Sequence, residues 1–304
     1  MKHVFGPVPS RRLGLSLGVD IIVPKTCTMD CVYCELGPTT NRTVERACYV
    51  DVDEVARELE ERLREHPAVD FVTLSGSGEP TLNADFRRAV TAIRALTDAP
   101  VAVLTNGSLV TDPDVRAGLA LVDVVAPSVD AVSPGAFEAV NRPDPALDPR
   151  EIIDALAAFG KDFRGQLWLE TVLVAGMNDD SDELRRIRDA IERIAPDRVH
   201  VNTVVRPPAD SSAMPLSPAA LRSAAARLGP LACVIAPTSV TAAPPLGEEG
   251  DLVVAMAERR PVTVSDVARS LGSSQAHAAK ILGRLLDEDR IRVVTHDRKQ
   301  YYRA

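Results

Sequence analysis

Short apolar runs alternate with amphipathic segments along the first two thirds of the chain. The apolar runs are rich in Val, Ile and Leu and are bounded by polar loops, which favours buried strands of a parallel sheet. We expect six such strands, at 18–23, 71–74, 101–104, 122–126, 167–173 and 199–204. The segments between them repeat apolar residues at helical spacing, and we expect helices at about 51–65, 83–96, 112–120, 149–160 and 181–194.

This alternation predicts the class of fold. Six strand–helix units in succession indicate an α/β protein whose parallel sheet curls into a partial (β/α)6 TIM-like barrel, here over residues 1–210. Asp51 and Asp85 stand where helix N-termini favour an acidic cap, and Pro113 stands where a first helical turn tolerates proline. Functional residues of such folds lie at the C-terminal ends of the strands.

The composition changes after the sixth expected strand. Prolines recur over residues 206–245, and we expect a helix at 217–228 and a short strand at 232–236 that cover the open side of the sheet. Residues 211–250 would therefore form a barrel-covering extension, which ends in a linker at 242–250.

Residues 251–304 have the pattern of a separate small domain. We expect three helices and two strands there, at 251–258, 263–271, 275–287, 291–295 and 300–303. A helix, a helix-turn-helix and a β-hairpin in this order predict a C-terminal winged helix-turn-helix domain. Its core would be filled by Val267, Leu271, Ala278, Ile281, Leu282 and Leu285.

The third helix of this domain offers polar side chains that could meet phosphates or base edges, namely Gln275, His277, Lys280 and Arg284. Residues 251–304 carry ten Lys and Arg against seven Asp and Glu, while residues 1–250 carry 25 against 36. Because the domain lacks a dense basic stripe, nucleic-acid binding and a protein-interaction role both stay open.

The overall composition limits the class of protein. With 304 residues, 45% of them hydrophobic and 26% charged, the chain is typical of a globular protein. No stretch approaches the ~18 consecutive apolar residues of a membrane span. The first seven residues lack the apolar segment of a signal peptide. We expect a cytoplasmic protein without a membrane partner.

Three of the five cysteines lie within eight residues, as Cys27, Cys31 and Cys34. The spacing C-x-x-x-C-x-x-C lets one short loop direct three thiolates at a single point, which suits a soft metal centre and above all an iron–sulfur cluster. Zinc is the alternative, but no histidine lies nearby to complete its four ligands. Cys48 and Cys233 stand apart, and we expect structural or free thiols there.

The cysteine spacing, with an aromatic residue before the last cysteine, resembles the radical SAM (S-adenosylmethionine) superfamily. Further motifs follow successive strands: Ser77-Gly78-Glu79-Pro80, which is similar to the G-G-E-P element of that family with one Gly→Ser change, then Thr105-Asn106-Gly107, Ser128-Val129-Asp130 and Val174-Ala175-Gly176-Met177-Asn178. The resemblance covers about residues 5–210. The segments 6–14 and 141–143 resemble a narrower branch, the Fe–S oxidoreductases related to wyosine-tRNA synthesis enzymes.

The resemblance implies a mechanism and a set of site residues. A [4Fe–4S] cluster would be bound by Cys27, Cys31 and Cys34, SAM would chelate the fourth iron, and a deoxyadenosyl radical would take a hydrogen atom from the substrate. The electron would come from a donor such as flavodoxin or ferredoxin. The cofactor-binding candidates are Tyr33 against the adenine, Gly78 for close backbone approach, Glu79 as acceptor from an ammonium group, and the short polar residues Asn106, Ser128 and Asp130.

The substrate and the catalytic residues beyond this set stay unknown. The branch resemblance and the C-terminal domain favour RNA modification, and Arg11 and Arg12, just before the first expected strand, are candidates for contact with substrate or SAM. Two other functions stay open. One is an Fe–S or SAM-responsive regulator that binds DNA, and the other is an activase that installs a radical on a protein partner.

Overall fold

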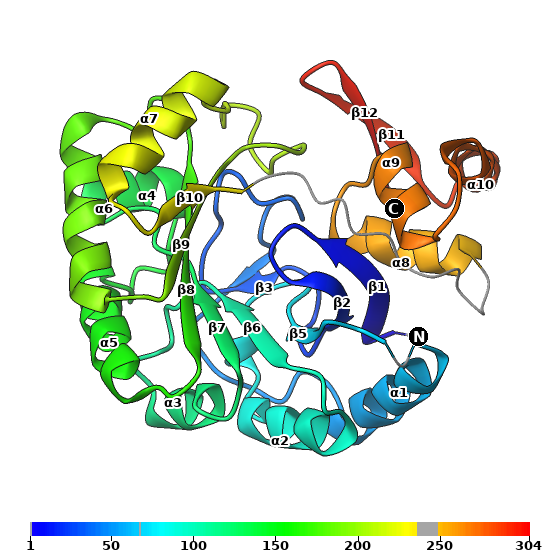
Figure 1. The fold of residues 1–304 in the computed structure, drawn as a ribbon, viewed down its shortest axis with the longest axis horizontal. Helices are drawn as coiled ribbons and strands as arrows, with labels where there is room; N and C mark the ends of the chain where they lie inside the picture. The colour runs from blue at the N-terminus through cyan, green and yellow to red at the C-terminus, as the bar shows by residue number, and fades with distance from the viewer. Residues whose placement is uncertain (1, 67, 236–248) are drawn as a thin grey trace.

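A curved sheet of eight strands forms the centre of the computed structural model, which describes residues 2–66, 68–235 and 249–304 (Figure 1). Its strands are β1 (Val4–Ser10), β2 (Gly14–Val19), β5 (Phe71–Leu74), β6 (Val101–Thr105), β7 (Val124–Pro127), β8 (Gln166–Leu173), β9 (Arg198–Thr203) and β10 (Ala232–Val234). They lie side by side in the order of the chain. All neighbouring pairs are parallel except β1 and β2, which are antiparallel. The mostly parallel α/β sheet of the sequence prediction is confirmed.

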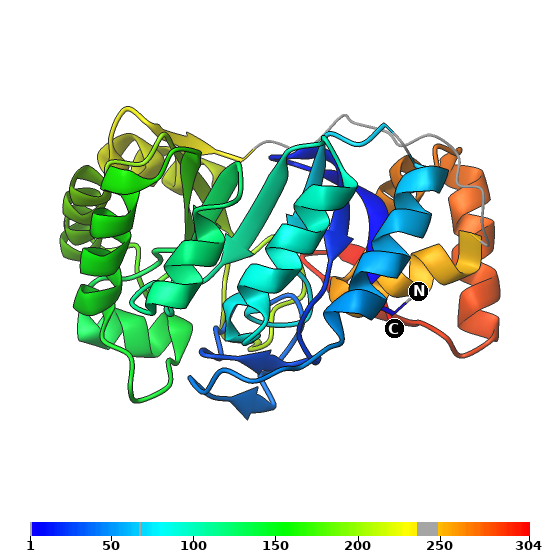
Figure 2. The same cartoon turned by 90° about the horizontal axis from the view of Figure 1, so that it is seen from below.

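Helices cover the outer face of this sheet (Figures 1 and 2). They are α1 (Val52–Glu65), α2 (Phe86–Leu96), α3 (Pro113–Leu119), α5 (Pro149–Asp162), α6 (Ser181–Ile194) and α7 (Pro218–Leu228). Each expected helix is present, and Asp51 caps α1 by accepting a hydrogen bond from the backbone N–H of Asp53. Asp85 stands at the N-terminus of α2 but makes no capping hydrogen bond with its side chain.

The first two strands differ from the prediction. The expected strand 18–23 lies earlier, as β2, because the backbone after Val19 turns away from the sheet toward the cysteines. The edge strand β1 was not predicted, since its two prolines argue against a strand interior. Proline is tolerated there because an edge strand leaves part of its backbone N–H groups without a ladder partner.

A short helix, α4 (Pro134–Asn141), was also not predicted. It has only eight residues, contains a glycine and shows little amphipathic pattern, although Ser133 caps it and Pro134 begins it. The other short elements are β3 (Thr26–Cys27), β4 (Asn41–Arg42) and the 3-10 turn η1 (Pro80–Leu82).

The part of residues 211–250 that the structure describes joins the sheet and its outer layer. The strand β10 extends the sheet beyond β9, and α7 packs against α6, β9 and β10 in the outer layer. The apolar face of α7 explains this placement, because Leu221, Ala224 and Leu228 belong to the same hydrophobic core as the other outer helices. Most of the expected linker, up to residue 248, lies outside the described residues.

Residues 249–304, here called the C-terminal module, have a hydrophobic core of their own. The module contains α8 (Glu249–Arg259), α9 (Val264–Ser270), α10 (Gln275–Asp287) and the hairpin β11 (Arg292–His296) and β12 (Lys299–Arg303). The six core residues expected from the sequence are all buried. Thr263 and Asp266 form a capping box at the start of α9. Helices α8 and α9 pack against β1, so the module stands at that edge of the sheet (Figure 1).

Candidate functional site

The three clustered cysteines lie on a loop, residues 25–43, that leaves the C-terminal end of β2. We call this segment the cysteine loop. Two backbone hydrogen bonds fix it to the loop after β5, from Lys25 N–H to Ser77 O at 2.7 Å and from Glu79 N–H to Thr26 O at 3.1 Å. Gly78 lies between them, and a Cβ atom there would overlap the carbonyl group of Thr26. The close approach that this glycine permits is therefore that of the cysteine loop itself.

Burial raises the pKa of all three thiols, that of Cys27 to about 12. The neighbouring carboxylates of Glu79 and Asp130 add to this effect at Cys27 and Cys31. The charge of Cys34 also raises the pKa of both Cys27 and Cys31. Such a group is neutral on its own and becomes a set of thiolates only with a cation, which is the behaviour of a metal site.

Three donors lie beside the sulfur atoms. Asn106 Nδ2 is 3.5 Å from Cys27 Sγ, and Asn141 Nδ2 is 3.4 Å from Cys31 Sγ. The ammonium group of Lys25 is buried without a hydrogen-bond partner among the described residues, and the charge of Cys34 acts on its pKa. Donors to thiolate sulfur stabilise and tune iron–sulfur clusters, so these residues fit a cluster at this place.

The carboxylate of Glu79 is 2% exposed and is occupied by donors of this chain. Its Oε1 atom accepts from Thr81 N–H, Thr81 Oγ1 and Thr105 Oγ1 at 3.1, 2.6 and 2.7 Å. Its Oε2 atom accepts from Asn106 N–H at 2.7 Å. Glu79 thus joins the ends of β5 and β6, and only Oε2 has capacity left for an ammonium group.

Asp130 connects the cysteine loop to α4 and β8. It accepts hydrogen bonds from Tyr33 Oη at 2.5 Å, from Asn141 Nδ2 at 2.8 Å and from Val172 N–H at 2.7 Å. Burial raises its pKa, against the effect of these donors. Ser128, half-buried at the end of β7, lines a small cavity together with Asn106, Asp130 and Asn141.

The structure therefore places the three cysteines and the six cofactor-binding candidates at the C-terminal ends of the strands, whereas Arg11 and Arg12 lie in the turn between β1 and β2. Asn141 was not among the predicted site residues. It lies in the 141–143 segment, which contributes to the branch resemblance, and that position could have identified it. Cys48 and Cys233 are exposed thiols apart from this cluster.

A larger cavity of about 370 Å³ lies inside the curve of the sheet. Tyr33 and Cys34 line the part of it next to the cysteine loop. Its other walls carry inward-facing residues of the strands, such as Ser16 and Thr73, whose hydroxyl oxygens are 2.6 Å apart. Met256 of α8 also lines it, so the C-terminal module contributes a wall. The arrangement is a chamber with mainly apolar walls and some polar and charged groups, next to a set of three thiols.

A family model matches the segment of the chain that holds the three cysteines. The family model of the radical SAM superfamily matches residues 21–188. This chain belongs to the radical SAM superfamily. Members of the superfamily use a [4Fe–4S] cluster and S-adenosylmethionine, and the half-buried thiols and their amide donors fit that cluster. Among the described residues, no helix is long and apolar enough to cross a membrane.

Relatives of similar sequence have names that do not state a shared activity. A GTPase Obg of Brachyspira hyodysenteriae is 33% identical over 96% of this chain, but the chain spans only 43% of that relative. A UPF0026 protein of Helicobacter pylori is 32% identical over 99% of this chain and 97% of its own length. A UPF0026 protein of Methanocaldococcus jannaschii is 34% identical over 71% of this chain and 67% of its own length.

Two solved structures share the fold. A radical SAM methyltransferase from Sphaerobacter thermophilus has a TM-score of 0.53 at 20% identity, over 72% of this chain and 65% of that chain. The FeFe-hydrogenase maturase HydG from Carboxydothermus hydrogenoformans has a TM-score of 0.52 at 15% identity, over 83% of this chain and 58% of its own. At these identities the likeness concerns the fold alone.

Proposed function

We propose that this chain is a radical SAM enzyme that takes a hydrogen atom from a substrate held in the chamber inside the sheet. One observation carries the proposal: three half-buried thiols have amide and ammonium groups beside them, and one of the thiols, Cys34, lines a half-open chamber. We assign Cys27, Cys31 and Cys34 as the cluster ligands. SAM would lie among Tyr33, Gly78, Glu79, Asn106, Ser128 and Asp130.

The chemistry that the cluster and SAM supply when bound is one-electron cleavage of SAM followed by hydrogen-atom abstraction. The residues of the chain hold and shield the reacting groups. Glu79 and Asp130 fix the strand ends and the cysteine loop through seven hydrogen bonds in all, so the site is rigid before any ligand arrives. Apolar wall residues such as Leu104 and Val172 limit the water in the chamber, which protects the radical from side reactions.

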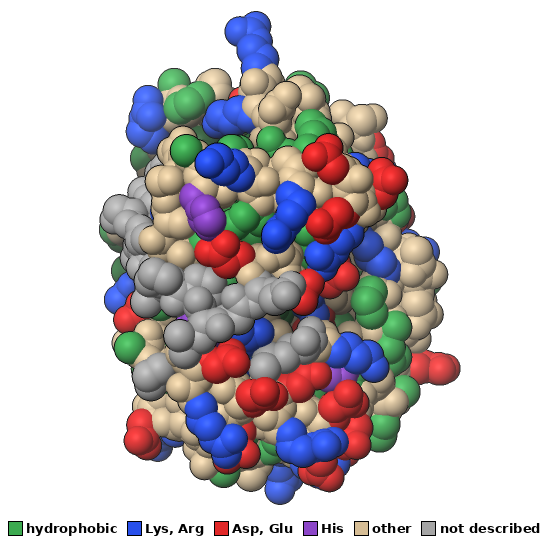
Figure 3. Space-filling model, turned by 90° about the vertical axis from the view of Figure 1, so that its right-hand side faces the viewer, with side chains coloured by type: hydrophobic (Ala, Val, Ile, Leu, Met, Phe, Trp, Pro, Cys, Tyr) green, Lys and Arg blue, Asp and Glu red, His purple; other side chains and the backbone are tan. Residues whose placement is uncertain are grey.

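Modification of RNA is the narrower form of this proposal, with the wyosine-related branch as its basis. The C-terminal module supports it by its element order, that of a winged helix, and by the exposed side chains of Lys280 and Arg284 on α10. Figure 3 shows basic and acidic side chains interspersed over the face of the molecule that it draws, without a continuous basic patch. Binding of nucleic acid by this face would therefore be weak and would fall as salt rises.

A regulator that responds to the cluster or to SAM is the second candidate. Contacts between the module and the cysteine loop favour it, since the guanidinium of Arg303 donates to the carbonyl oxygen of Leu36. A change at the cysteines would then reach the module directly. An activase that acts on a protein partner is a third form of the same chemistry.

The proposed setting follows from the chemistry. Reduced thiols need a reducing compartment, so we propose the cytoplasm. The enzyme also needs a one-electron donor, for which a flavodoxin or a ferredoxin is suitable.

The test begins with anaerobic reconstitution with iron and sulfide. The wild type should bind a cluster and release 5′-deoxyadenosine from SAM under reduction. Replacement of Cys27, Cys31 or Cys34 by Ala should abolish both. Cys48→Ala and Cys233→Ala are matched controls, because these thiols are exposed and apart from the site. Undiminished cleavage in the first three variants would refute the proposal.

A second measurement separates enzyme from regulator and sorts the substrates. The reconstituted protein is incubated with deuterated cell extract divided into RNA, protein and small-molecule fractions. Deuterium in 5′-deoxyadenosine identifies the fraction that holds the substrate. No transfer from any fraction, together with tight DNA binding, would favour the regulator.

A further inference from the structure

Five arginines line the chamber inside the sheet, and they come from three distant parts of the chain: Arg11, Arg12, Arg206, Arg259 and Arg260. So many guanidinium groups around about 370 Å³ are unusual, because a buried cation needs an anionic partner. The question is which of them have such a partner within the chain.

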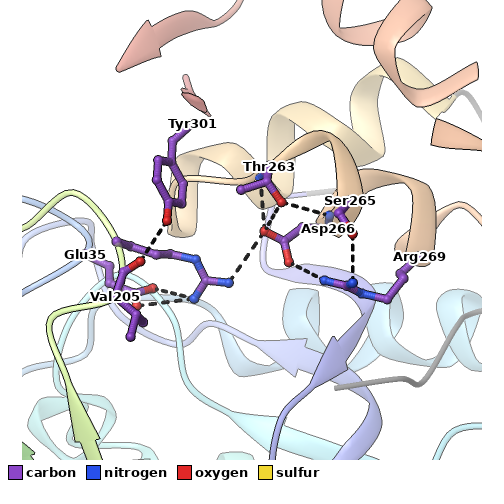
Figure 4. A network of polar contacts seen from close by, with 8 residues as sticks. Glu35, Val205, Thr263, Ser265, Asp266, Arg269 and Tyr301 are labelled. Atoms are coloured by element: carbon purple, nitrogen blue, oxygen red, sulfur yellow. Dashed lines mark hydrogen bonds and ion pairs between the residues drawn. The ribbon is translucent and has the colours of Figure 1, made fainter. Parts of the chain in front are cut away.

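Three of the five are paired with carboxylates. Arg12 forms an ion pair with Glu170, and Arg259 Nε is 3.4 Å from Asp20 Oδ2. Arg206 lies between two acids, with Glu35 at 3.2 Å and Asp266 at 3.7 Å. Figure 4 shows the network around Glu35 and Asp266. In it, Asp266 also accepts hydrogen bonds from Thr263, the N-terminal cap of α9, and from Arg269 within that helix.

The other two arginines have no carboxylate partner. Arg11 makes one side-chain hydrogen bond, at 3.4 Å to the amide oxygen of Asn202. Arg260 makes no ion pair and no side-chain hydrogen bond with any residue in 2–66, 68–235 or 249–304. Burial lowers the pKa of both groups, that of Arg260 to about 10, and the nearby charge of Arg206 lowers both further, whereas the charge of Glu35 acts on both in the opposite direction.

Two arginines of the chamber therefore lack an ion pair. The other three contact five carboxylates, because Arg259 Nη1 also lies 3.4 Å from Glu258 Oε2. Arg11 and Arg260 line the same cavity as Arg206, whose positive charge lowers the pKa of both. A cation that is partly withdrawn from water and has no ion pair is stabilised by an anion that enters with a ligand.

We propose that the chamber binds a small-molecule substrate by an oxyanion, a carboxylate or a phosphate, held between Arg11 and Arg260. The inference rests on the proposed radical SAM function, takes a small molecule in place of RNA as its substrate, and adds the chemical class of that substrate. A guanidinium presents two parallel N–H donors that match the two oxygens of such a group. The volume suits one small molecule rather than a macromolecule.

The geometry also gives the C-terminal module a part in this site. Arg260 directly follows α8, while Arg11 lies in the turn between β1 and β2. Tyr33 and Cys34 line the same chamber. An anion at the two arginines would thus leave the rest of the substrate directed along the chamber toward the cysteine loop. The module closes the substrate site, whatever else it binds.

The test uses the reconstituted full-length protein and two simple probes, inorganic phosphate and succinate, titrated by calorimetry at constant ionic strength. The wild type should bind at least one probe saturably. Arg260→Gln and Arg11→Gln should each weaken that binding roughly tenfold or more, the usual size of a charge-assisted hydrogen-bond pair. Arg260→Lys should retain part of the affinity. Arg292→Gln, at an exposed arginine of the same module, is the matched control and should bind like the wild type.

The outcomes separate this inference from the proposed function. A preference for phosphate or for succinate identifies the class of oxyanion, and either supports the inference. No saturable binding by the wild type, or equal binding by Arg260→Gln, overturns it while cleavage of SAM leaves the proposed function in place. A matching loss of SAM affinity in Arg260→Gln also overturns it, because the arginine would then serve the carboxylate of SAM.

Discussion

Replacement of Gly78 by alanine tests how the strand ends hold the cysteine loop. Gly78 does not have a left-handed backbone conformation, so an alanine there meets no intrinsic strain. The obstacle is steric: the new Cβ would lie 2.9 Å from the carbonyl carbon of Thr26 and closer still to its oxygen, whereas Cβ atoms essentially never come within 3.0 Å of other atoms. The cysteine loop must therefore move away from the end of β5.

The cost follows from the contacts that this movement breaks. The two backbone hydrogen bonds on either side of Gly78, at 2.7 and 3.1 Å, cannot both survive it. A buried backbone group left without a partner costs about 1–3 kcal/mol, so the displaced loop costs about 2–5 kcal/mol. Because Cys27 directly follows Thr26, this cost appears in cluster binding, which should weaken by at least roughly thirtyfold.

The assay is the iron and sulfide content per chain after anaerobic reconstitution, with the far-ultraviolet spectrum as a check of folding. Gly135→Ala is the matched control. Gly135 lies in α4, and its added Cβ meets no atom within 4 Å, so this variant should keep its cluster and gain about 0.5–1 kcal/mol of stability.

A full cluster in Gly78→Ala would refute this reasoning. If that variant kept its iron but bound SAM more weakly, the glycine would serve the approach of SAM and not that of the cysteine loop.

Three further predictions concern the polar groups around the site. Asn141→Ala removes a hydrogen-bond donor to the sulfur of Cys31. The reduction potential of the cluster should therefore fall by about 40 mV, the equivalent of about 1 kcal/mol for one electron, in an anaerobic redox titration. An unchanged potential would contradict the role of this hydrogen bond. Burial lowers the pKa of His200 from 6.5 to about 4, so the unfolded state takes up the proton first as the pH falls. The free energy of unfolding should therefore fall by about 2 kcal/mol between pH 7 and pH 5. Urea unfolding at these two pH values should show this fall for the wild type and not for His200→Gln. Arg259→Met leaves the carboxylate of Asp20 buried without its cation and should destabilise the protein by about 3 kcal/mol in the same assay, whereas Arg284→Met, at an exposed pair, should not.

Local pattern was sufficient for the elements with a strong signal. The helix α6 and the helix α10 have the bounds that apolar periodicity and their capping residues predict. The strand β5 agrees to the residue as well. Local pattern did not predict the elements that depend on tertiary contacts. The segment β1 is a strand because it pairs with β2 and packs against α8 and α9. The helix α4 is so short that packing, and not apolar periodicity, stabilises it.

The placement of residue 211–250 shows the same limit. The helix α7 was predicted correctly, but its contacts with α6, β9 and β10 came only from the structure, because an amphipathic pattern indicates that one face of a helix is buried and not which elements cover it.

The amino-acid sequence by itself determined the chemistry: the thiol spacing, the strand-end motifs and the parallel α/β fold all follow from residues that are near one another in the chain. The tertiary structure decided the rest. In the folded chain, Glu79 links two strand ends by hydrogen bonds, and Asn141 lies beside the sulfur of Cys31. Arg260 of the C-terminal module and Arg11 line the same chamber. The reason is physical. A motif determines which chemical groups a short segment offers. Which charged side chains meet in the chamber depends on residues that only folding brings together.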